Sequence, residues 1–329
     1  MTDQVLRWGL LSTARINEAV IDPIRASKRN KLVAVGSRSQ ATAEAYARKY
    51  KIDKAHGTYE ALLADPEVDV IYDPLPNNMH AEWAIKAIQA GKHVLIEKPI
   101  ALTVAEVDAI SAAAAKHKRV AAEAFMYRHH PQTIKVVEMV QKGELGKVKF
   151  VRGTFTAVFN RDPNYRFEPD MGGGALWDVG CYPLSYTRAV LGAEPLEVFA
   201  WQEQGSTGVD EVFAAQMRFP GDVYAQFDCS FILPFRANME IVGTKGRLFI
   251  PAPYKPGLNE TLEVADTDGK NRLIEVKGQA LYSGEIEDMA DAVLLGKTPR
   301  VSLADSRANV ATILALFESA RTGKPVLIK

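Results

Sequence analysis

The chain has 329 residues, which is more than one ordinary hydrophobic core accommodates and therefore favours two domains. Forty basic residues balance forty acidic ones, so no charge excess points to nucleic acid or to an anionic membrane. No stretch approaches the roughly 18 apolar residues of a membrane span, and the N-terminus does not look like an export signal. Because Cys181 and Cys229 are the only cysteines, we expect a reduced, cytoplasmic protein without a disulfide framework.

The first third of the chain alternates short apolar segments with segments of helical spacing. Strands are expected at 5–11, 32–35, 68–72, 93–96 and 119–122, and helices at 15–27, 42–51, 80–90 and 103–117. The last helix opens with Thr-x-x-Glu, the signature of a capping box. This alternation predicts a doubly wound α/β domain, a Rossmann-type parallel sheet covered on both faces, over residues 1–124. Ligands of such domains bind beyond the carboxyl ends of the strands.

The turn after the first strand occupies the position of a dinucleotide-binding fingerprint. Ser12, Ala14 and Asn17 stand where the glycines of G-x-G-x-x-G would be. Small residues still allow a pyrophosphate to approach a helix N-terminus. An ordinary strand-to-helix turn explains the segment about equally well. The predicted cofactor contacts here are Ser12, Thr13, Ala14, Arg15 and Ile16.

The second strand is followed by Ser37 and Arg38, where an NAD site usually has an acidic residue for the ribose hydroxyl. An arginine suits a 2′-phosphate instead. Since a hydrogen bond to a charged group contributes roughly 1.5–3 kcal/mol, one or two would favour NADP over NAD by about tenfold to several hundredfold. The alternative is that Arg38 is only a solvated loop residue.

Two later loops complete the predicted cofactor crevice. The prolines of Pro74–Asn77 give a stiff wall beside a flat ligand, and Glu97-Lys98-Pro99 places a lysine at a strand end. A surface ion pair between Glu97 and Lys98 is the alternative reading. The further predicted cofactor contacts are Leu75, Pro76, Asn77, His80, Glu97 and Lys98.

Residues 125–329 change to long segments that alternate between polar and apolar residues. Strands are expected at 147–159, 211–219, 222–233 and 239–250, a hairpin at 261–277, and helices at 131–142, 283–295 and 302–321. The pattern predicts an α+β domain with a large, mostly antiparallel open sheet. Gly172–Gly174 permits close backbone approach or forms a flexible turn. On a helix, Asp178 and Tyr182 would share a face, and Tyr182 alone would also fit a core aromatic.

Five segments carry a resemblance to a known family. They are GLLSTARIN (9–17), PLPNNMH (74–80), GKHVLIEKP (91–99), EAFMYRHHP (123–131) and GGGALWDVGCYP (172–183). Through them the chain resembles, over essentially its whole length, the glucose-fructose oxidoreductase, inositol dehydrogenase and rhizopine-catabolism family of NAD(P)-dependent oxidoreductases. The resemblance implies that Lys98 contacts the nicotinamide ribose and the substrate hydroxyl, and that Tyr182 is the acid/base. It also implies a homodimer through the open sheet face, or a tetramer.

A tyrosine at position 182, where many members have histidine, is similar to one branch of that family. This branch contains the dimeric dihydrodiol dehydrogenases, NADP-dependent xylose dehydrogenases and glucose-fructose oxidoreductase, and Ser37-Arg38 also resembles its NADP-preferring members. Met126 stands where the dihydrodiol dehydrogenases have an aromatic residue, which disfavours an aromatic diol as substrate. The absence of an N-terminal arm over the cofactor favours freely exchanging NADP.

The chemistry expected from these residues is removal of a hydroxyl proton as hydride passes to the nicotinamide. Tyrosine has an ordinary pKa near 10, and a neighbouring ammonium such as Lys98 would lower it and make Tyr182 a general base. Asp178 would orient either partner or a sugar hydroxyl. The predicted substrate contacts, each of which also has a structural reading, are Arg128, Phe159, Tyr165, Arg166 and Asp178. The expected substrate is carbohydrate-like, such as xylose or glucose at C1.

Three other functions remain open from the sequence. A metal site is disfavoured because His129 and His130 are adjacent and no H-x-x-x-H pattern includes His80 or His93, so no metal is predicted. A non-catalytic, NADP-binding regulator would not need both Lys98 and Tyr182. A dihydrodiol dehydrogenase acting on aromatic trans-diols is the alternative enzyme. The substrate, the reaction direction and the choice of dimer or tetramer are not determined by the sequence.

Overall fold

The computed structural model describes residues 5–161 and 163–328, which divide into two compact units. The first unit contains the chain up to His129 together with Tyr282–Arg307, and the second contains His130–Leu281 and the chain from Ala308 onward. This division differs from the expected single boundary after residue 124. The difference arises because helix α8 (Ser283–Leu295) packs against helix α1 (Asn17–Ala26), a pairing that no local sequence pattern reveals.

The first unit contains a six-stranded parallel sheet in the order β3-β2-β1-β4-β5-β6. Its strands are β1 (Leu6–Leu11), β2 (Asn30–Gly36), β3 (Lys54–His56), β4 (Val70–Asp73), β5 (His93–Glu97) and β6 (Ala121–Ala124). The order reverses direction at β1, as in doubly wound sheets, so the predicted fold of this part is confirmed. The sequence pattern missed β3, whose three residues Lys-Ala-His carry no alternation.

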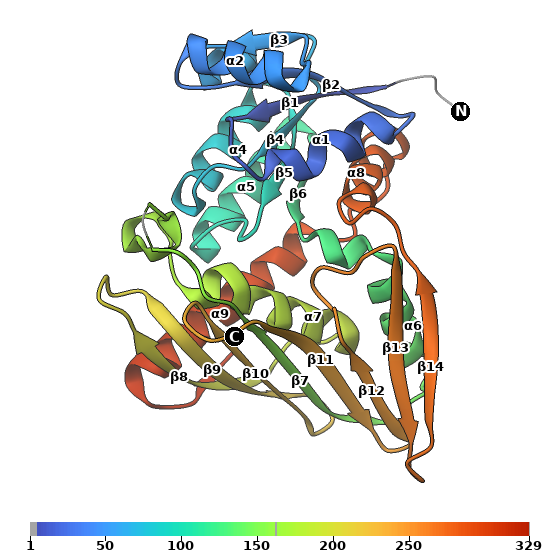
Figure 1. Ribbon diagram of the computed structural model, residues 1–329. Coiled ribbons are helices and arrows are strands. Elements are labelled where there is room, and N and C mark those ends of the chain that lie inside the picture. The colour runs from blue at the N-terminus through green and yellow to red at the C-terminus, as the bar shows by residue number, and fades with distance from the viewer. Residues whose placement is uncertain (1–4, 162, 329) are drawn as a thin grey trace. The chain divides into compact units, whose positions relative to one another are not determined.

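Helices cover both faces of this sheet (Figure 1). On one face, α1 and α8 pack on strand residues such as Trp8, Leu10 and Tyr72, which are fully buried. The other helices are α2 (Gln40–Tyr50), α3 (Tyr59–Ala64), α4 (His80–Gln89) and α5 (Val104–His117). Gly9 faces the other side, where an added Cβ would lie 3.0 Å from the side chains of Leu62 and Val68. The capping box predicted at Thr103 and Glu106 is present at the start of α5.

The second unit contains a nine-stranded sheet in the order β14-β13-β12-β11-β7-β10-β9-β8-β15. Its strands are β7 (Val148–Thr156), β8 (Glu197–Gln204), β9 (Asp210–Phe219), β10 (Val223–Ser230), β11 (Arg236–Gly243), β12 (Gly246–Ile250), β13 (Asn259–Asp266), β14 (Asn271–Lys277) and β15 (Val326–Leu327). Among the described pairs only β7 and β10 are parallel, which confirms the prediction of a mostly antiparallel sheet.

Helices α6 (Pro131–Gln141), α7 (Cys181–Leu191) and α9 (Leu303–Thr322) complete the described set. The rings of Phe213 on β9 and Phe317 on α9 lie 5.6 Å apart, which marks the helix-covered face of the sheet. On the opposite face, Trp201 and Tyr224 are 56% and 49% exposed. None of the helices in the described residues is long and apolar enough to cross a membrane.

Candidate functional site

The turn after β1 has a conformation that glycine usually adopts. Ser12 has φ +142°, in the region where a side chain is strained, and it is buried. Its hydroxyl accepts a hydrogen bond from the amide of Ala14 at 3.2 Å, and its carbonyl accepts one from the side-chain amide of Asn17 at 2.8 Å. Ser12 therefore occupies a glycine position of the fingerprint in backbone geometry, and α1 begins directly after this turn.

Of the two predicted cofactor contacts after β2, Ser37 is buried and Arg38 is exposed to solvent. Ser37 is buried and donates its amide to the carbonyl of His56 at 2.9 Å, which ties the end of β2 to the edge strand β3. Arg38 follows it and is exposed. The backbone of Arg38 lies at the same edge of the sheet as the Ser12 turn, because β1 and β2 are parallel neighbours.

His80 connects the two loops that were predicted to form the wall of the crevice. Its Nδ1 lies 2.8 Å from the carbonyl oxygen of Pro99, and its Nε2 lies 2.6 Å from the carbonyl oxygen of Leu75. Burial outweighs these contacts and lowers the pKa of His80 to about 4. A neutral ring donates to only one of the two carbonyls. The fully buried His80 thus braces the loops on either side of it.

Several buried acids surround the segment that carries Lys98. Oε1 of Glu97 accepts a hydrogen bond from the hydroxyl of Tyr72 at 2.5 Å, and its Oε2 accepts the amide of Lys98 at 3.2 Å. Glu285 on α8 is 1% exposed, and burial together with the Glu97 charge raises its pKa well above its ordinary value. Burial likewise raises the pKa of Asp73 well above the ordinary value. The segment that carries Lys98 thus lies near two buried acids with raised pKa values, and its own Glu97 is hydrogen-bonded.

In the second unit, the structure brings together four of the predicted substrate residues. Nε of Arg166 donates to Oδ2 of Asp178 at 2.6 Å, and the guanidinium lies 5.2 Å from the ring centre of Phe159 and 4.9 Å from that of Tyr165. Burial lowers the pKa of Arg166, but Asp178, Tyr165 and Tyr182 outweigh it, so the pKa lies above its ordinary value. Charged and aromatic groups are thus combined on one side of Asp178.

Asp178 and Tyr182 belong to one helical segment, but its first turn is wider than the α-helix expected. Leu176–Gly180 forms a π-helical turn, a feature often found at functional sites, and α7 continues from Cys181. Tyr182 is 6% exposed, with its ring centre 5.4 Å from that of Phe155 and 5.7 Å from that of Tyr254. The tyrosine is therefore fixed by aromatic neighbours, as a core residue would be.

The remaining predicted substrate residue, Arg128, belongs to the first unit. Its Nη1 lies 3.2 Å from Oδ2 of Asp305, so this arginine takes part in an ion pair within its own unit. His129, from the disfavoured metal alternative, lies 3.3 Å from Oδ2 of Asp288. Among the described residues, no group of three or more histidine, cysteine or acidic side chains is arranged to hold a metal ion.

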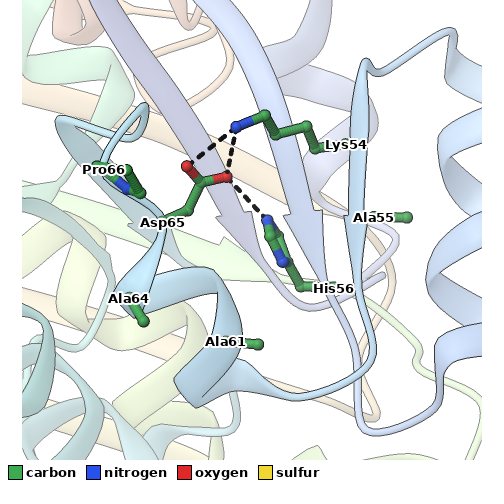
Figure 2. A pocket seen from close by; sticks show the side chains of 7 residues that line it. All are labelled: Lys54, Ala55, His56, Ala61, Ala64, Asp65 and Pro66. Carbon is green, nitrogen blue, oxygen red and sulfur yellow. Dashed lines mark hydrogen bonds and ion pairs between the residues drawn. The ribbon is translucent and has the colours of Figure 1, made fainter.

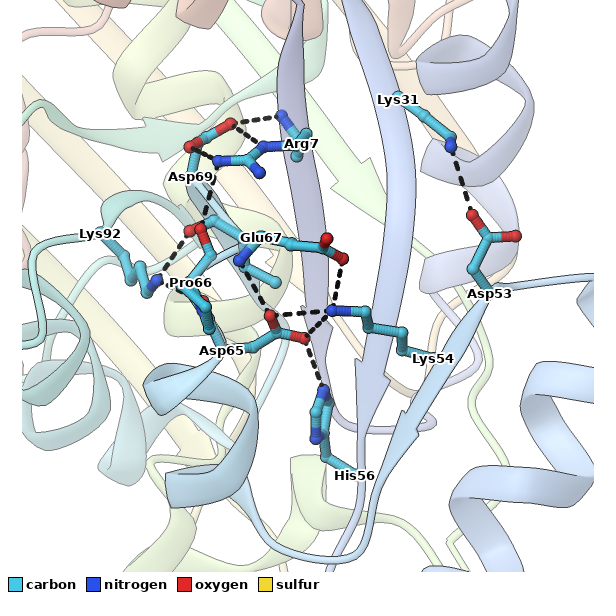
Figure 3. Close-up of polar contacts among 11 residues, drawn as sticks. Arg7, Lys31, Asp53, Lys54, His56, Asp65, Pro66, Glu67, Asp69 and Lys92 are labelled. Carbon is cyan, nitrogen blue, oxygen red and sulfur yellow. Dashed lines mark hydrogen bonds and ion pairs between the residues drawn. The ribbon is translucent and has the colours of Figure 1, made fainter.

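A hollow of about 670 Å³ on the first unit lies between β3 and α3 (Figure 2). The buried carboxylate of Asp65 contacts two side chains of β3: its Oδ2 lies 3.0 Å from Nζ of Lys54 and 3.0 Å from Nε2 of His56. Burial raises the pKa of Asp65, but the Glu67 amide, Lys54 and His56 outweigh it and lower the value. Figure 3 shows that neighbouring charges are paired in the same way, for instance Arg7 with Asp69 at 2.7 Å. These ion pairs connect the edge strand β3 to the end of α3, and the charged groups that line the hollow are paired with one another.

The sequence analysis did not single out Asp73, Asp210 or Glu285, which are buried acids near predicted site segments. Asp73 could have been found, because it is the last residue of β4, at the carboxyl edge of the sheet. Glu285 and Asp210 carry no such local signal, since the segments they approach are far away in the sequence.

Comparisons with known proteins agree over both units. Residues 6–125 match the family model described as an oxidoreductase family with an NAD-binding Rossmann fold, and residues 133–249 match the GFO/IDH/MocA C-terminal domain. D-xylose 1-dehydrogenase (NADP(+)) 2 of Haloferax volcanii is 35% identical over 98% of this chain and 99% of its own. Trans-1,2-dihydrobenzene-1,2-diol dehydrogenase of Xenopus laevis is 31% identical over 94% of this chain and 96% of its own.

Among solved structures, the chain is similar to KijD10, a 3-ketoreductase from Actinomadura kijaniata, in complex with NADP and TDP-benzene. The TM-score is 0.90 at 28% identity, and the match covers 96% of this chain and 98% of the other. Solved structures of that reductase also include variants in which one tyrosine was replaced by phenylalanine or one lysine by alanine or glutamate.

Proposed function

The chain belongs to the GFO/IDH/MocA family of NAD(P)-dependent oxidoreductases, and we propose that it transfers hydride between NADP and a carbohydrate-type hydroxyl or carbonyl, such as C1 of an aldose. The observation that carries this proposal is the group around Asp178. An ion pair with Arg166, flanked by the rings of Phe159 and Tyr165, offers both hydrogen-bonding groups and aromatic faces. Such a combination suits the polar edges and apolar faces of a sugar ring.

The cofactor site of this proposal is built from the turn after β1 and the end of β2. The backbone turn at Ser12 leads into the N-terminus of α1, which suits a pyrophosphate. Arg38 would bind the 2′-phosphate of NADP. The Haloferax relative is named an NADP-dependent dehydrogenase and the Actinomadura reductase was solved with NADP, which supports this choice. His80 would hold the loops of Leu75, Pro76, Asn77 and Pro99 in place.

The reaction proposed is reversible removal of a proton and a hydride from one carbinol group. When bound, NADP would supply the hydride acceptor. Tyr182 accepts the hydroxyl proton as general base, and it returns the proton when the carbonyl is reduced. Lys98 binds the reacting oxygen and supplies a positive charge that favours the phenolate. Asp178, oriented by Arg166, accepts a hydrogen bond from a neighbouring substrate hydroxyl.

Support for these two roles comes from the Actinomadura reductase. In that protein, the replaced lysine and tyrosine are separated by the same number of residues as Lys98 and Tyr182 are here. The match between the two chains covers nearly their whole lengths.

A dihydrodiol dehydrogenase is the second candidate, and the Xenopus relative favours it. The side chain of Met126 weighs against it, because it is 2% exposed and offers no ring for an aromatic diol to stack on. Cys181 and Cys229 are both buried and not joined in a disulfide, which agrees with a reducing, cytoplasmic location that we include in the proposal.

We further propose that the protein is a homodimer through the exposed face of the nine-stranded sheet. A hollow of about 380 Å³ on this face is lined by residues of β7, β8, β9 and β10, including Phe150, Phe199 and Tyr224. Exposed aromatic residues on a sheet face are typical of surfaces that bind another protein surface. A second copy of the same face would cover them symmetrically.

The test is NADPH formation, followed by absorbance, with NADP or NAD and a panel of aldoses, inositols and trans-diols. We expect activity with an aldose and NADP. Tyr182→Phe should bind NADP normally and lose at least about 100-fold in kcat, as loss of a general base does. Tyr186→Phe, one helical turn later on α7, is the matched control and should retain activity. Activity only with a trans-diol would favour the second candidate, and normal turnover by Tyr182→Phe would refute the assignment.

A further inference from the structure

Asp210, the first residue of β9, has its carboxylate buried against the start of the π-helical turn. Its Oδ2 accepts a hydrogen bond from the amide of Leu176 at 2.7 Å, and the amide of Ala175 also donates to the carboxylate. The residue is 3% exposed. The first amides of a helix have no carbonyl partner within the helix, so a carboxylate at this place satisfies them and is favoured by the helix dipole.

Gly174 leaves the space that this carboxylate fills. Its φ is +120°, and a Cβ built on it would lie only 2.1 Å from Oδ1 of Asp210. The carbonyl of Gly174 accepts the amide of Asp178 at 3.1 Å, so the same residue is hydrogen-bonded to the segment that carries Asp178. Position 174 thus requires glycine for two reasons, its backbone conformation and the approach of Asp210.

The turn is fixed from its other side by the loop of Arg166. The carbonyl of Arg166 accepts the amide of Gly174 at 2.9 Å, and the Arg166 side chain holds Asp178. The contact to Asp210 and the loop of Arg166 therefore both hold the start of this turn. A shift of its first residues would move Asp178 directly, and Tyr182 through the helix that follows.

We propose that Asp210 is a positioning residue of the oxidoreductase reaction, which sets the place of Asp178 and Tyr182 by holding the first amides of their helical segment. This inference rests on the proposed function, since it takes Asp178 and Tyr182 as the groups that act on the substrate. Asp210 itself contacts neither substrate nor cofactor in this scheme. Its effect on the rate arises because displacements of about 1 Å can cost on the order of 100-fold in turnover.

The experiment compares Asp210→Ala, Asp210→Asn, Gly174→Ala and the Asp210→Ala/Gly174→Ala double variant under aldose oxidation. We expect Asp210→Ala to lower kcat by about 10- to 100-fold with NADP affinity within about twofold of wild type. Asp210→Asn keeps an acceptor oxygen and should recover most of kcat. Gly174→Ala displaces the carboxylate and should resemble Asp210→Ala. The double variant should be no slower than the slower single variant, because both changes break one contact.

Ser319→Ala is the control for a plain loss of stability. Ser319 is fully buried on α9 of the same unit, where its hydroxyl accepts the amide of Ala200 at 3.1 Å and donates to the carbonyl of Lys324 at 2.7 Å. We expect a lowered melting temperature and near-normal kcat. All rates are measured well below each variant's melting temperature, so a stability loss shared with Ser319→Ala does not by itself lower kcat.

Each outcome bears on the inference. A kcat within about twofold of wild type for Asp210→Ala or for Gly174→Ala overturns it, as does a fall of kcat in Ser319→Ala equal to that in Asp210→Ala. Multiplicative losses in the double variant also overturn it, because they separate the two residues. The proposed function fails separately, if Tyr182→Phe turns over normally. If Asp210→Ala does not fold, Gly174→Ala still decides the matter, because its kcat should fall while that of Asp210→Asn should stay near that of wild type.

Discussion

Arg166 and Asp178 form an ion pair in which Nε donates to Oδ2 at 2.6 Å, with side chains 29% and 7% exposed. Arg166→Met would leave the Asp178 carboxylate without this partner in a mostly buried place. We expect a loss of about 3 kcal/mol in unfolding free energy, together with at least a tenfold loss in kcat/KM. Urea unfolding and steady-state kinetics measure the two effects. The Arg166→Met/Asp178→Asn double variant should regain stability and stay inactive. A double variant with restored activity would contradict the role given to Asp178.

The strained backbone at Ser12 gives a prediction that compares two variants. Ser12→Ala and Ser12→Gly both remove the hydroxyl that accepts the Ala14 amide, but only glycine relieves a φ of +142°. Ser12→Gly should therefore be more stable than Ser12→Ala by about 1 kcal/mol in denaturant unfolding. NADP affinity should be retained in Ser12→Gly. Equal stability of the two variants would show that the turn is not strained at this residue.

Arg38 should determine the preference of the enzyme for NADP over NAD. Arg38→Ala removes the group proposed to bind the 2′-phosphate, so the preference for NADP over NAD in kcat/KM should fall by about tenfold to several hundredfold. The rate with NAD should change little. Since a phosphate contact is screened by salt, the wild-type KM for NADP should also rise with ionic strength. An unchanged ratio between the two cofactors in Arg38→Ala would place the phosphate elsewhere.

The buried ring of His80 predicts how stability changes with pH. Its pKa is about 4 in the folded protein, because of burial, and 6.5 as its ordinary value. The unfolded chain therefore binds the proton more readily, and the contribution present above pH 6.5 is lost as the pH falls toward 4. The full loss amounts to roughly 3 kcal/mol. His80→Gln should flatten the dependence of unfolding free energy on pH in this window. The parallel contribution of His93, whose pKa is also lowered to about 4, should remain.

The proposed dimer is tested by charging its surface. Trp201→Glu combined with Tyr224→Glu places two carboxylates on the exposed sheet face and should convert the dimer to a monomer in light scattering after gel filtration. Leu295→Glu changes an equally exposed apolar residue, 57% exposed at the end of α8, and should leave the dimer intact. Wild-type protein that is monomeric at micromolar concentration would contradict the proposal.

The regular elements were predictable where the hydrophobic pattern is long enough to specify a period. The expected helix at 283–295 coincides with α8, and the capping box at Thr103 set the start of α5 within one residue. The pattern failed at β3 and α3, which have three and six residues, too few to show a period. It also missed β8, whose second half, Trp201–Gln204, alternates poorly because it is mostly solvent-exposed.

The candidate site was predictable only where its residues follow strand ends or lie within a short motif. Arg166 and Asp178 are twelve residues apart, and both were predicted as substrate contacts; the structure pairs them with each other, while their role toward a substrate stays a prediction. The contact between Asp210 and Leu176 spans 34 residues and two elements, so it depends on how the sheet and the turn pack. The positive φ of Ser12 could not be predicted either, because a serine does not indicate that its backbone adopts a conformation typical of glycine. The roles of Lys98 and Tyr182 stay predictions.

The return of the chain to its first unit has a consequence for synthesis on the ribosome. Ile286, Met289 and Ala290 of α8 belong to the same hydrophobic cluster as Val20 and Ile24 of α1. When the first 129 residues have left the ribosome, α8 has not yet been synthesised. The apolar surface that α8 covers in the folded protein therefore stays exposed until residue 295 has been translated. The nascent chain therefore exposes an aggregation-prone apolar surface through most of its synthesis. A chain truncated after residue 129 would lack α8, and its hydrophobic core would be incompletely packed.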